Sequence, residues 1–418
     1  MKQSRILVFA SYFAPNSFSE ALSNNKFVLA LKKKGYDVTV ISTSSYVGDK
    51  YENSWSTLWK SLKENTHNIP SIDTNSKNRR LSKLIAIFTL NHPINGVSWS
   101  YKAFNLAIKL HQQNPFNFVI SRSISDFGHL PALKFKKTIG LKWVANWNDP
   151  PYFIFPPPYS EKTNYIDQFF YSRYIKSVAK AADYNTFPSQ RLYKYMKKEL
   201  GVFKDVNSEI LPHLNTNLNL DLSVVKVNHF RICHAGNLSK ERSPELFLNA
   251  LKSLSNNCDG EIECFIIGVE NVGLKAKVKE LNLDKIVKFT GAMSYQKTLE
   301  FLVTCSVGLL IEAKCDEGIF LPSKVSDYAQ AKLPILAVSP KVGTMRDLLS
   351  EFGGGVISDN TDESSIYNGL ETLYLAWSKN ELNTFLSQNF DNYLSEDYMI
   401  KKYRDFMLNK LNFSAIAK

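Results

Sequence analysis

The sequence is poor in cysteine and lacks an export signal. Five of its 418 residues are cysteines, and none is arranged as a CxxC pair. An odd number with this spacing argues against a disulfide-stapled fold and matches no zinc finger. The chain begins MKQSR and runs straight into the strand-like ILVFASYF, without the apolar core of a signal peptide. We therefore expect a reduced, cytoplasmic environment.

Apolar runs long enough to cross a membrane are also missing. The run LIAIFTL (84–90) has seven residues and follows the basic KNRRLSK (77–83), whereas a spanning helix needs about 20. Two interpretations stay open for this segment. Either it lies on a membrane surface, or it is a core helix with a solvated basic flank.

Acidic residues are scarce in the first half of the chain. Residues 1–205 contain 29 Lys and Arg against 13 Asp and Glu, a balance of +16, so the rest of this +12 chain carries −4. The asymmetry predicts an anionic partner, which is nucleic acid, an acidic membrane surface or a phosphorylated substrate. Solubility alone is the simpler alternative. The absence of an RNP-like motif or extended basic helix argues against nucleic acid.

Strand-like and helix-like segments alternate along the chain. A strand at 5–12, a polar loop, a helix at 20–34, Gly35 and a strand at 36–43 make one βαβ unit. After a less regular 44–100 segment, strands are predicted at 116–123, 141–150, 184–189, 208–214, 229–236, 262–268, 286–291, 306–312, 334–338 and 355–358. We therefore predict an α/β protein with two Rossmann-like domains, each a doubly wound parallel sheet, that face a cleft.

The element pattern also predicts the domain bounds. Residues 1–205 are expected to form the N-terminal domain and 206–378 the C-terminal one, with the join between about 205 and 228. Residues 379–418 are expected to be a helical segment. Its amphipathic SEDYMIKKYRDFMLNKL has no strand after it and can close either domain, including by packing back on the first.

Two stretches place polar residues where a parallel sheet binds ligands. In LPSKVSDYAQAKLPILAV (321–338), Pro322 suits the first position of a helix, so Ser323 and Lys324 would present a hydroxyl, amides and a cation to an anion. Asp327 follows one turn later on the same face. An ordinary capped helix with a surface lysine stays open as the alternative.

The second stretch is HAGNLSKERSPELFLNAL (234–251). The predicted strand ends at Gly236, where a missing side chain allows close approach of the backbone to a ligand. Lys240 and Arg242 follow in a polar loop, and two cations at this edge of a sheet can neutralise a diphosphate. A solvated loop is the alternative.

Taken in order, these stretches resemble the donor domain of GT-B glycosyltransferases, most closely the retaining family 4 used in bacterial capsule and O-antigen assembly. The intervening FIIGVENVGLKAKVKELNLDKIVKFTGAMSYQKTLEFLVTCSVGLLIE continues the resemblance. Two earlier segments, ILVFASYFAPNSFSEALSNNKFVLALKKKGYDVTVIST and SRSISDFGHLPALKFKKTIGLKWVANWNDP, resemble the family's acceptor-binding domain. The resemblance covers most of residues 5–378. It implies transfer of a sugar from a nucleotide-diphosphate sugar to an acceptor hydroxyl, with retention of anomeric configuration.

The resemblance also implies roles for single residues. Arg242 is expected on the donor diphosphate, and Ser323 and Lys324 at the phosphate-facing helix start. Asp327 takes the place of the second acid of the family's Glu-x7-Glu motif, near the nucleotide ribose. His129 matches an acceptor-domain histidine that reaches the donor sugar.

The sequence departs from the family pattern at several positions. Ile319 stands in register with the first glutamate of the motif, and Glu317, two residues earlier, is the candidate to contact the sugar hydroxyls. Asn237 stands where many members have arginine. The glycine-rich loop after the first strand is replaced by NSFSE (16–20).

These features define the expected partners and the rivals. The chain contains no Asp-x-Asp, so we expect a metal-independent reaction with no cofactor besides the nucleotide-sugar co-substrate. The expected acceptor is a glycan or lipid-linked sugar at the inner face of the plasma membrane, whose acidic lipids attract the basic half. The loop PPYFIFPPPY (150–159) either lines the acceptor cleft or is a packed linker. A nucleotide-sugar 2-epimerase and a degenerate, non-catalytic partner of another glycosyltransferase remain alternatives.

Overall fold

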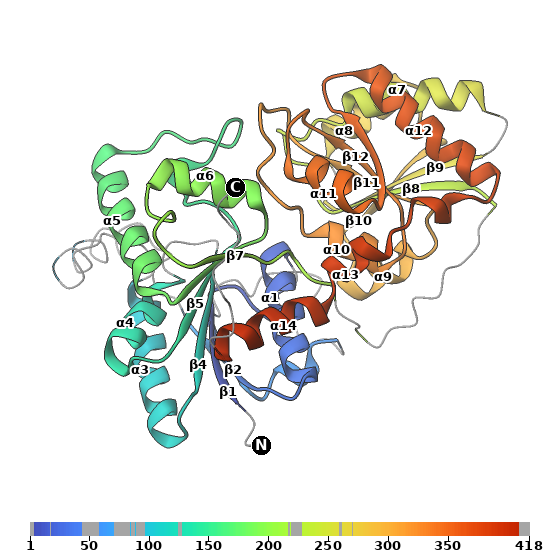
Figure 1. The fold of residues 1–418 in the computed structure, drawn as a ribbon. Coiled ribbons are helices and arrows are strands. Elements are labelled where there is room, and N and C mark those ends of the chain that lie inside the picture. Colours follow the sequence, from blue (N-terminus) through green and yellow to red (C-terminus); the bar gives the residue numbers. More distant parts are fainter. Residues whose placement is uncertain are drawn as a thin grey trace. The chain divides into compact units, whose positions relative to one another are not determined.

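The chain forms two compact units (Figure 1). A computed structural model describes residues 4–16, 18–43, 58–70, 97–123, 128–215, 228–258, 261–269 and 271–408, together with Leu84, Phe88 and Leu218. Unit 1 consists of the described residues of Met1–Phe155, Ser160–Thr216 and Glu396–Lys418. Unit 2 consists of those of Pro156–Tyr159 and Asn217–Ser395. Residues 379–395 thus group with unit 2, and the final helix groups with unit 1.

Unit 1 is built on a parallel seven-stranded sheet in the order β3-β2-β1-β4-β5-β6-β7. The strands are β1 (Arg5–Ala10), β2 (Asp37–Thr43), β3 (Thr66–Ile69), β4 (Phe118–Ser123), β5 (Trp143–Trp147), β6 (Tyr184–Phe187) and β7 (Ser208–Ile210). The helices include α1 (Ser19–Lys33), α3 (Val97–Gln113), α4 (Leu130–Ile139), α5 (Tyr165–Ala181), α6 (Gln190–Leu200) and α14 (Glu396–Leu408). The strand order reverses at β1, between β2 and β4, which is where open α/β sheets bind ligands.

Helix α1 is buried on more than its apolar face because α14 lies beside it. The rings of Phe27 and Tyr403 are 4.8 Å apart, and Lys33 Nζ lies 3.8 Å from a carboxylate oxygen of Glu396. Asn24 and Asn25 on α1 are completely buried too, and they make hydrogen bonds to Tyr12 and Ala14 in the loop after β1. Helix α14 therefore packs on unit 1. The sequence had left open whether this amphipathic segment packs on the first or the second domain.

Unit 2 repeats the architecture with a parallel six-stranded sheet in the order β10-β9-β8-β11-β12-β13. The strands are β8 (Phe230–Ala235), β9 (Ile262–Ile267), β10 (Val287–Gly291), β11 (Val307–Ile311), β12 (Ile335–Ser339) and β13 (Gly355–Asp359). The helices are α7 (Glu245–Asn257), α8 (Val272–Glu280), α9 (Tyr295–Leu302), α10 (Lys324–Gln330), α11 (Thr344–Phe352), α12 (Glu363–Ser378) and α13 (Gln388–Tyr393). The strand order reverses at β8, so the loops after β8 and β11 flank the expected ligand position.

The two parallel sheets confirm the predicted fold class. Strands β11 and β12 are almost wholly apolar and buried along their whole length, as expected of parallel strands that are covered on both faces. The sequence analysis did not predict β3, α3 or α6, whereas α13 falls in the segment 379–418 that was expected to be helical. Short 3₁₀ turns at Lys60–Leu62, Tyr152–Ile154 and Leu382–Phe385 complete the described elements.

Most of the LIAIFTL segment and all of KNRRLSK lie outside the described residues. Leu84 and Phe88 are described, and both are helical and exposed, at 52% and 84%. None of the helices in the described ranges combines the length and apolar character that a bilayer-spanning segment needs.

Candidate functional site

The ends of β8 and β11 in unit 2 hold His234 beside Lys324. His234 lies in β8 and is completely buried, while Lys324 is the first residue of α10. Lys324 Nζ donates to His234 Nε2 at 3.0 Å, and His234 Nδ1 lies 3.1 Å from the Leu309 carbonyl oxygen. Since a carbonyl only accepts, Nδ1 carries the ring proton and Nε2 offers its lone pair to the lysine. The fold thus fixes the amine at the carboxyl edge of the sheet.

Lys324 occupies an environment that disfavours its positive charge. Burial and then the nearby charge of Arg242 lower the pKa of Lys324 to about 7, against the opposite effects of Cys233 and Asp327. Gly236 lies next to the amine, since a Cβ at this position would be 3.5 Å from Nζ, and its φ of +112° favours glycine. An arriving anion would relieve the unfavourable charge and raise this pKa.

Arg242 lies in the loop after β8 and acts on the same region. Its charge lowers the pKa of both Lys324 and His234. Its Nε donates to the hydroxyl of Tyr159 at 3.1 Å, and the Tyr159 ring packs edge-on against Phe320 with centroids 5.7 Å apart. Tyr159 is the last residue of the aromatic and proline-rich loop, so this end of the loop packs within unit 2.

Glu312, directly after β11, is a site residue that the sequence analysis missed. Burial raises the pKa of Glu312 to about 7, with smaller lowering effects from the Ser339 hydroxyl and from Arg242 and Arg346. Its Oε2 is enclosed and lacks a hydrogen bond of ordinary geometry within the described part of the chain. An acid at the end of the apolar SVGLLIE strand was the available signal. We call Glu312, His234, Gly236, Arg242 and Lys324 the Lys324 cluster.

Asp327 lies one turn into α10, as expected, but its contact is with α9. The hydroxyl of Tyr295, the first residue of α9, donates to Asp327 Oδ1 at 2.6 Å. The predicted helix starts at Pro322 or Ser323, yet α10 begins at Lys324 and the Ser323 side chain makes no cap hydrogen bond. The predicted helix start is therefore one to two residues early, and Ser323 lies just outside the helix.

Helix α10 is held against the sheet by Tyr328. Its hydroxyl donates to the Leu309 carbonyl at 2.8 Å and accepts from the Ala235 N–H at 3.1 Å. The Tyr328 ring lies against Gly308, where an added Cβ would come within 2.6 Å of the ring. These contacts fix the position of Lys324 relative to β8 and β11.

The departures from the family motif have structural explanations. Ile319, in register with the first glutamate, is completely buried and serves the core. Glu317 is exposed, and the next residue, Gly318, donates from its N–H to the Val342 carbonyl at 2.9 Å. The Asn237 side chain accepts from the Val269 N–H at 2.7 Å, so it ties two loops together rather than supplying a cation.

In unit 1, His129 is buried at the start of α4. It is 1% exposed, its Nδ1 lies 2.7 Å from the Ser121 hydroxyl, and its ring centroid lies 4.3 Å from that of Trp147. Burial lowers the pKa of His129 to about 3, so the ring is neutral at physiological pH. Its Nε2 is enclosed and has no hydrogen-bond partner in the described ranges. All the other predicted site residues belong to unit 2.

A second buried polar network in unit 1 was not predicted from sequence. Glu20 on α1 accepts from the side-chain amides of Asn148 at 2.7 Å and Asn24 at 3.1 Å. Asn24 in turn accepts from Arg122 Nε at 2.6 Å. Burial raises the pKa of Glu20 more than the Arg122 charge lowers it. The network joins the ends of β4 and β5 to α1, close to where the strand order reverses.

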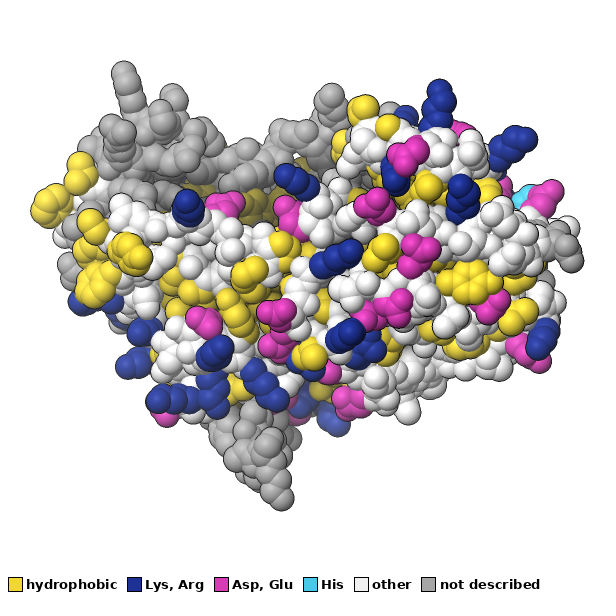
Figure 2. Space-filling view, turned by 90° about the horizontal axis from the view of Figure 1, so that it is seen from above, with side chains coloured by type: hydrophobic (Ala, Val, Ile, Leu, Met, Phe, Trp, Pro, Cys, Tyr) yellow, Lys and Arg dark blue, Asp and Glu magenta, His cyan; other side chains and the backbone are white. Residues whose placement is uncertain are grey.

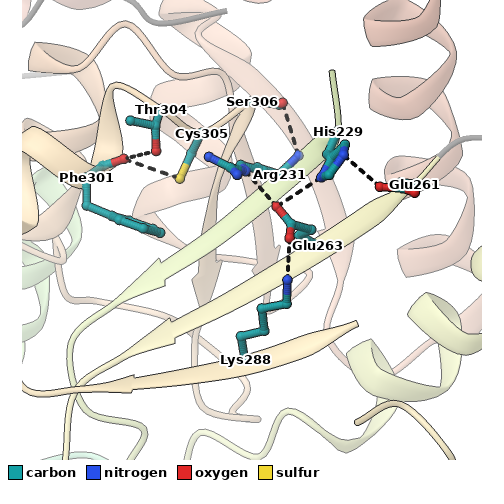
Figure 3. Close-up of polar contacts among 9 residues, drawn as sticks. All are labelled: His229, Arg231, Glu261, Glu263, Lys288, Phe301, Thr304, Cys305 and Ser306. Atoms are coloured by element: carbon teal, nitrogen blue, oxygen red, sulfur yellow. Dashed lines mark hydrogen bonds and ion pairs between the residues drawn. The ribbon is translucent and has the colours of Figure 1, made fainter. Parts of the chain in front are cut away.

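A group of paired charges in unit 2 lies at the starts of the strands, at the other end of the sheet (Figure 3). Glu263 accepts from Arg231 at 2.6 Å and from Lys288, and His229 Nδ1 lies 3.3 Å away. These hydrogen bonds hold the pKa of Glu263 at about 2 even though burial acts in the opposite direction. The group joins the starts of β8, β9 and β10, away from the Lys324 cluster, and its role is to hold the strands together.

Comparison with known proteins identifies the family to which the domain with the Lys324 cluster belongs. Residues 223–389 match the family described as Glycosyl transferases group 1, and all five cluster residues lie within this match. Unit 2 is a group 1 glycosyltransferase domain. The chain therefore contains a group 1 glycosyltransferase domain, and its two parallel sheets have the GT-B fold, as the sequence predicted. No curated protein matches the sequence.

Solved glycosyltransferases share the fold at low sequence identity. A glycosyltransferase from Rickettsia africae is 13% identical, with a TM-score of 0.67 over 99% of this chain and 100% of that one. HepE from Anabaena, solved with UDP and glucose, is 11% identical, with a TM-score of 0.64 over 98% and 100%. WaaG, involved in lipopolysaccharide biosynthesis, is 12% identical, with a TM-score of 0.62 over 96% and 99%.

An epimerase-like protein shares the fold as well. A candidate UDP-N-acetylglucosamine 2-epimerase from Listeria monocytogenes is 9% identical, with a TM-score of 0.56 over 99% of this chain and 98% of that one. At such identities the likeness concerns the fold alone. The group 1 match, rather than the shared fold, therefore decides the reaction class.

The chemistry of the Lys324 cluster suits a diphosphate. It combines two cationic side chains, Lys324 and Arg242, with an open backbone position at Gly236 at the edge where ligands of parallel sheets bind. Within the described ranges, no group of three or more His, Cys, Asp and Glu side chains is arranged to hold a metal ion.

Proposed function

We propose that this glycosyltransferase moves a sugar from a nucleotide-diphosphate sugar to a glycan or lipid-linked acceptor in surface polysaccharide biosynthesis. The observation that carries the donor assignment is Lys324, which lies against His234 and next to Arg242 with its charge disfavoured. The UDP and glucose bound to HepE and the lipopolysaccharide role of WaaG support the substrate class and the process.

In the proposed reaction, the bond between the anomeric carbon and the diphosphate oxygen breaks. The diphosphate leaves with the bonding electrons, the acceptor oxygen takes its place on the carbon, and the acceptor hydroxyl gives up its proton. Lys324 and Arg242 stabilise the charge that develops on the leaving diphosphate. Because these fixed cations do so, we expect a metal-independent reaction, and the family resemblance implies retention of configuration.

Other residues have proposed roles around the donor. Asp327, held by Tyr295, would accept from the nucleotide ribose. The neutral ring of His129 and the exposed carboxylate of Glu317 stay as proposed contacts of the donor sugar. Ser323 would add its hydroxyl next to Lys324. These roles come from the family resemblance and from the positions of the side chains within each unit.

Binding of UDP, GDP and CMP, measured by calorimetry in EDTA, tests the donor assignment. We expect one nucleotide to bind to the wild type and to bind at least tenfold more weakly to Lys324→Ala, because removal of a charge-assisted contact costs about 1.5–3 kcal/mol. Lys285→Ala, which removes an exposed lysine of unit 2, is the matched control and should bind like the wild type. If Lys324→Ala binds the nucleotide as tightly as the wild type, the diphosphate does not bind at the Lys324 cluster.

Two alternatives give different results in the same samples. A nucleotide-sugar 2-epimerase would return an isomer of the donor in the absence of any acceptor, which product chromatography detects. A degenerate, non-catalytic partner would fold normally yet bind none of the three nucleotides. Two features favour this second alternative. Ile319, in register with the first glutamate of the family motif, is buried, and the nearby Glu317 is exposed.

The acceptor proposal places the protein at the inner face of the plasma membrane. Lipid-linked acceptors lie in that leaflet, and the +16 charge of residues 1–205 would attract the first half of the chain to acidic lipids. We therefore propose a cytoplasmic protein with peripheral membrane contact.

A further inference from the structure

One helix of unit 1 exposes a group of large apolar side chains. Tyr165, Ile166 and Phe169, all in the first turns of α5, are exposed at 86%, 64% and 58%. On the side of the molecule where α5 lies (Figure 1), the space-filling view shows protruding hydrophobic side chains with Lys and Arg side chains nearby (Figure 2). Single exposed apolar residues are common, whereas three in adjacent turns of one helix mark an interaction surface.

The core of unit 1 does not account for these three side chains. The opposite side of α5 packs inward through Tyr174, Ile175, Val178 and other buried residues. The first turn of α5 is well anchored, because the Asn164 side chain accepts from the Ile166 N–H at 2.9 Å. The apolar side chains therefore project from a fixed helix and not from a frayed end.

The same face of α5 continues with cations. Arg173, Lys176 and Lys180 are exposed, and they follow Ile166 and Phe169 at alternating steps of three and four residues, so all five lie along one side of the helix. The Arg173 guanidinium lies 5.7 Å from the centroid of the Phe169 ring, which joins the apolar and basic parts. The α5 sequence contains three cations and one acid, Asp167.

We propose that this face, formed by Tyr165, Ile166, Phe169, Arg173, Lys176 and Lys180 and called the α5 face below, binds the surface of an anionic lipid bilayer. Exposed aromatic and branched side chains insert at the boundary between headgroups and acyl chains, while Lys and Arg pair with acidic headgroups. The positive charge of this part of the chain favours an acidic bilayer as the partner of the α5 face. The +16 balance of residues 1–205 would attract acidic lipid in addition to the three cations of the helix. The inference rests on the proposed function only in giving this contact a purpose, which is access to a lipid-linked acceptor.

Flotation of the full-length protein with vesicles tests the α5 face. The vesicles contain phosphatidylcholine with or without phosphatidylglycerol, and the measured quantity is the apparent partition coefficient. We expect wild-type binding to the acidic vesicles only, and a decrease of at least tenfold in Ile166→Ser/Phe169→Ser. The triple variant Arg173→Gln/Lys176→Gln/Lys180→Gln should lose roughly 100-fold, because each cation near an acidic surface contributes to attraction.

Two control variants identify which exposed apolar side chains matter. Val269→Ser/Val272→Ser removes a comparable pair in unit 2, exposed at 67% and 83%, and should bind like the wild type. Leu84→Ser/Phe88→Ser should retain binding if the α5 face is the principal contact. Loss of binding in this variant alone, with normal binding by Ile166→Ser/Phe169→Ser, would overturn the proposal.

Three further results would also overturn it. These are equal binding to neutral vesicles, wild-type binding by the α5 variants, and a wild-type dimer that Ile166→Ser/Phe169→Ser converts to a monomer without any vesicle binding. Calorimetry with UDP, GDP and CMP on the same variants separates this inference from the proposed function. Nucleotide binding without vesicle binding refutes the α5 face, and vesicle binding without nucleotide binding refutes the donor assignment instead.

Discussion

The affinity for a nucleotide sugar should fall steeply as the pH rises above neutrality. In the unliganded protein, burial and Arg242 lower the pKa of Lys324 to about 7. A bound diphosphate places negative charge beside the amine and raises that pKa, so binding takes up a proton. Affinity is therefore highest below pH 7, where the lysine is already charged, and is lost progressively above it.

The change in the pKa of Lys324 on binding sets how strongly the dissociation constant depends on pH. If the pKa of Lys324 in the complex exceeds the range tested, the dissociation constant rises roughly 30-fold between about pH 6 and about pH 8.5, which is about 2 kcal/mol. Glu312 adds to the decrease, because burial raises its pKa to about 7 and its ionised form would oppose an anionic ligand beside Arg242. His234, whose pKa lies well below 6.5, stays neutral throughout.

Calorimetry with an intact nucleotide sugar is the appropriate assay. Its two phosphates are both diesters and do not titrate in this range, whereas the terminal phosphate of a free nucleotide does, with a pKa of about 6. Titrations in buffers with different ionisation enthalpies count the protons taken up. Two variants separate the contributions of Lys324 and Glu312 to the pH dependence of the affinity. In Glu312→Gln only the titration of Lys324 should remain. In Lys324→Arg, whose side chain is always charged, only the titration of Glu312 should remain.

One result would refute the reasoning. If the wild type binds the nucleotide sugar with an affinity and a proton count that do not change with pH, Lys324 does not contact the diphosphate. A steep dependence that persists unchanged in both Lys324→Arg and Glu312→Gln would assign the titration to a group outside the Lys324 cluster.

Three further predictions concern the surrounding structure. Gly236→Ala should cost about 1–2 kcal/mol of stability, because φ at this position is +112°. It should also weaken nucleotide binding, because the added Cβ would occupy space 3.5 Å from Lys324 Nζ. An unchanged affinity in calorimetry and an unchanged urea midpoint would contradict this. Glu263→Gln should cost roughly 1–2 kcal/mol at neutral pH after allowance for solvent screening, since the folded pKa of Glu263 is about 2. That contribution is present above the ordinary pKa of 4.5 and lost as pH falls toward 2, so urea unfolding should show the difference between wild type and variant shrinking at acidic pH. Arg122→Met should cost about 3 kcal/mol because it leaves the buried Glu20 and Asn24 without their cationic neighbour; Glu20→Gln in the same chain should recover part of the loss, and additive unfolding energies would argue against the network.

The sequence by itself determined the fold class, and it predicted where the proposed donor site lies. Apolar strands and amphipathic helices alternate locally, so most strands could be predicted within a few residues, and parallel sheets bind ligands at one edge. This reasoning placed Gly236, Arg242 and Lys324 at that edge. It missed α3 and α6, although α6 is strongly amphipathic and Ser189 caps its start, and it placed the start of α10 one to two residues early.

Only the tertiary structure decided which side chains meet. Lys324 and His234 are 90 residues apart in sequence, and Glu20 and Asn148 are 128 apart. Such pairs depend on strand order and on how each helix packs, which local patterns do not encode. The side chain of Asn237, bonded to a neighbouring loop, and the packing of α14 against α1 were likewise set by long-range contacts. Burial in the folded chain then shifts the pKa values of Lys324 and Glu312, and with them the chemistry that the residue types alone left open.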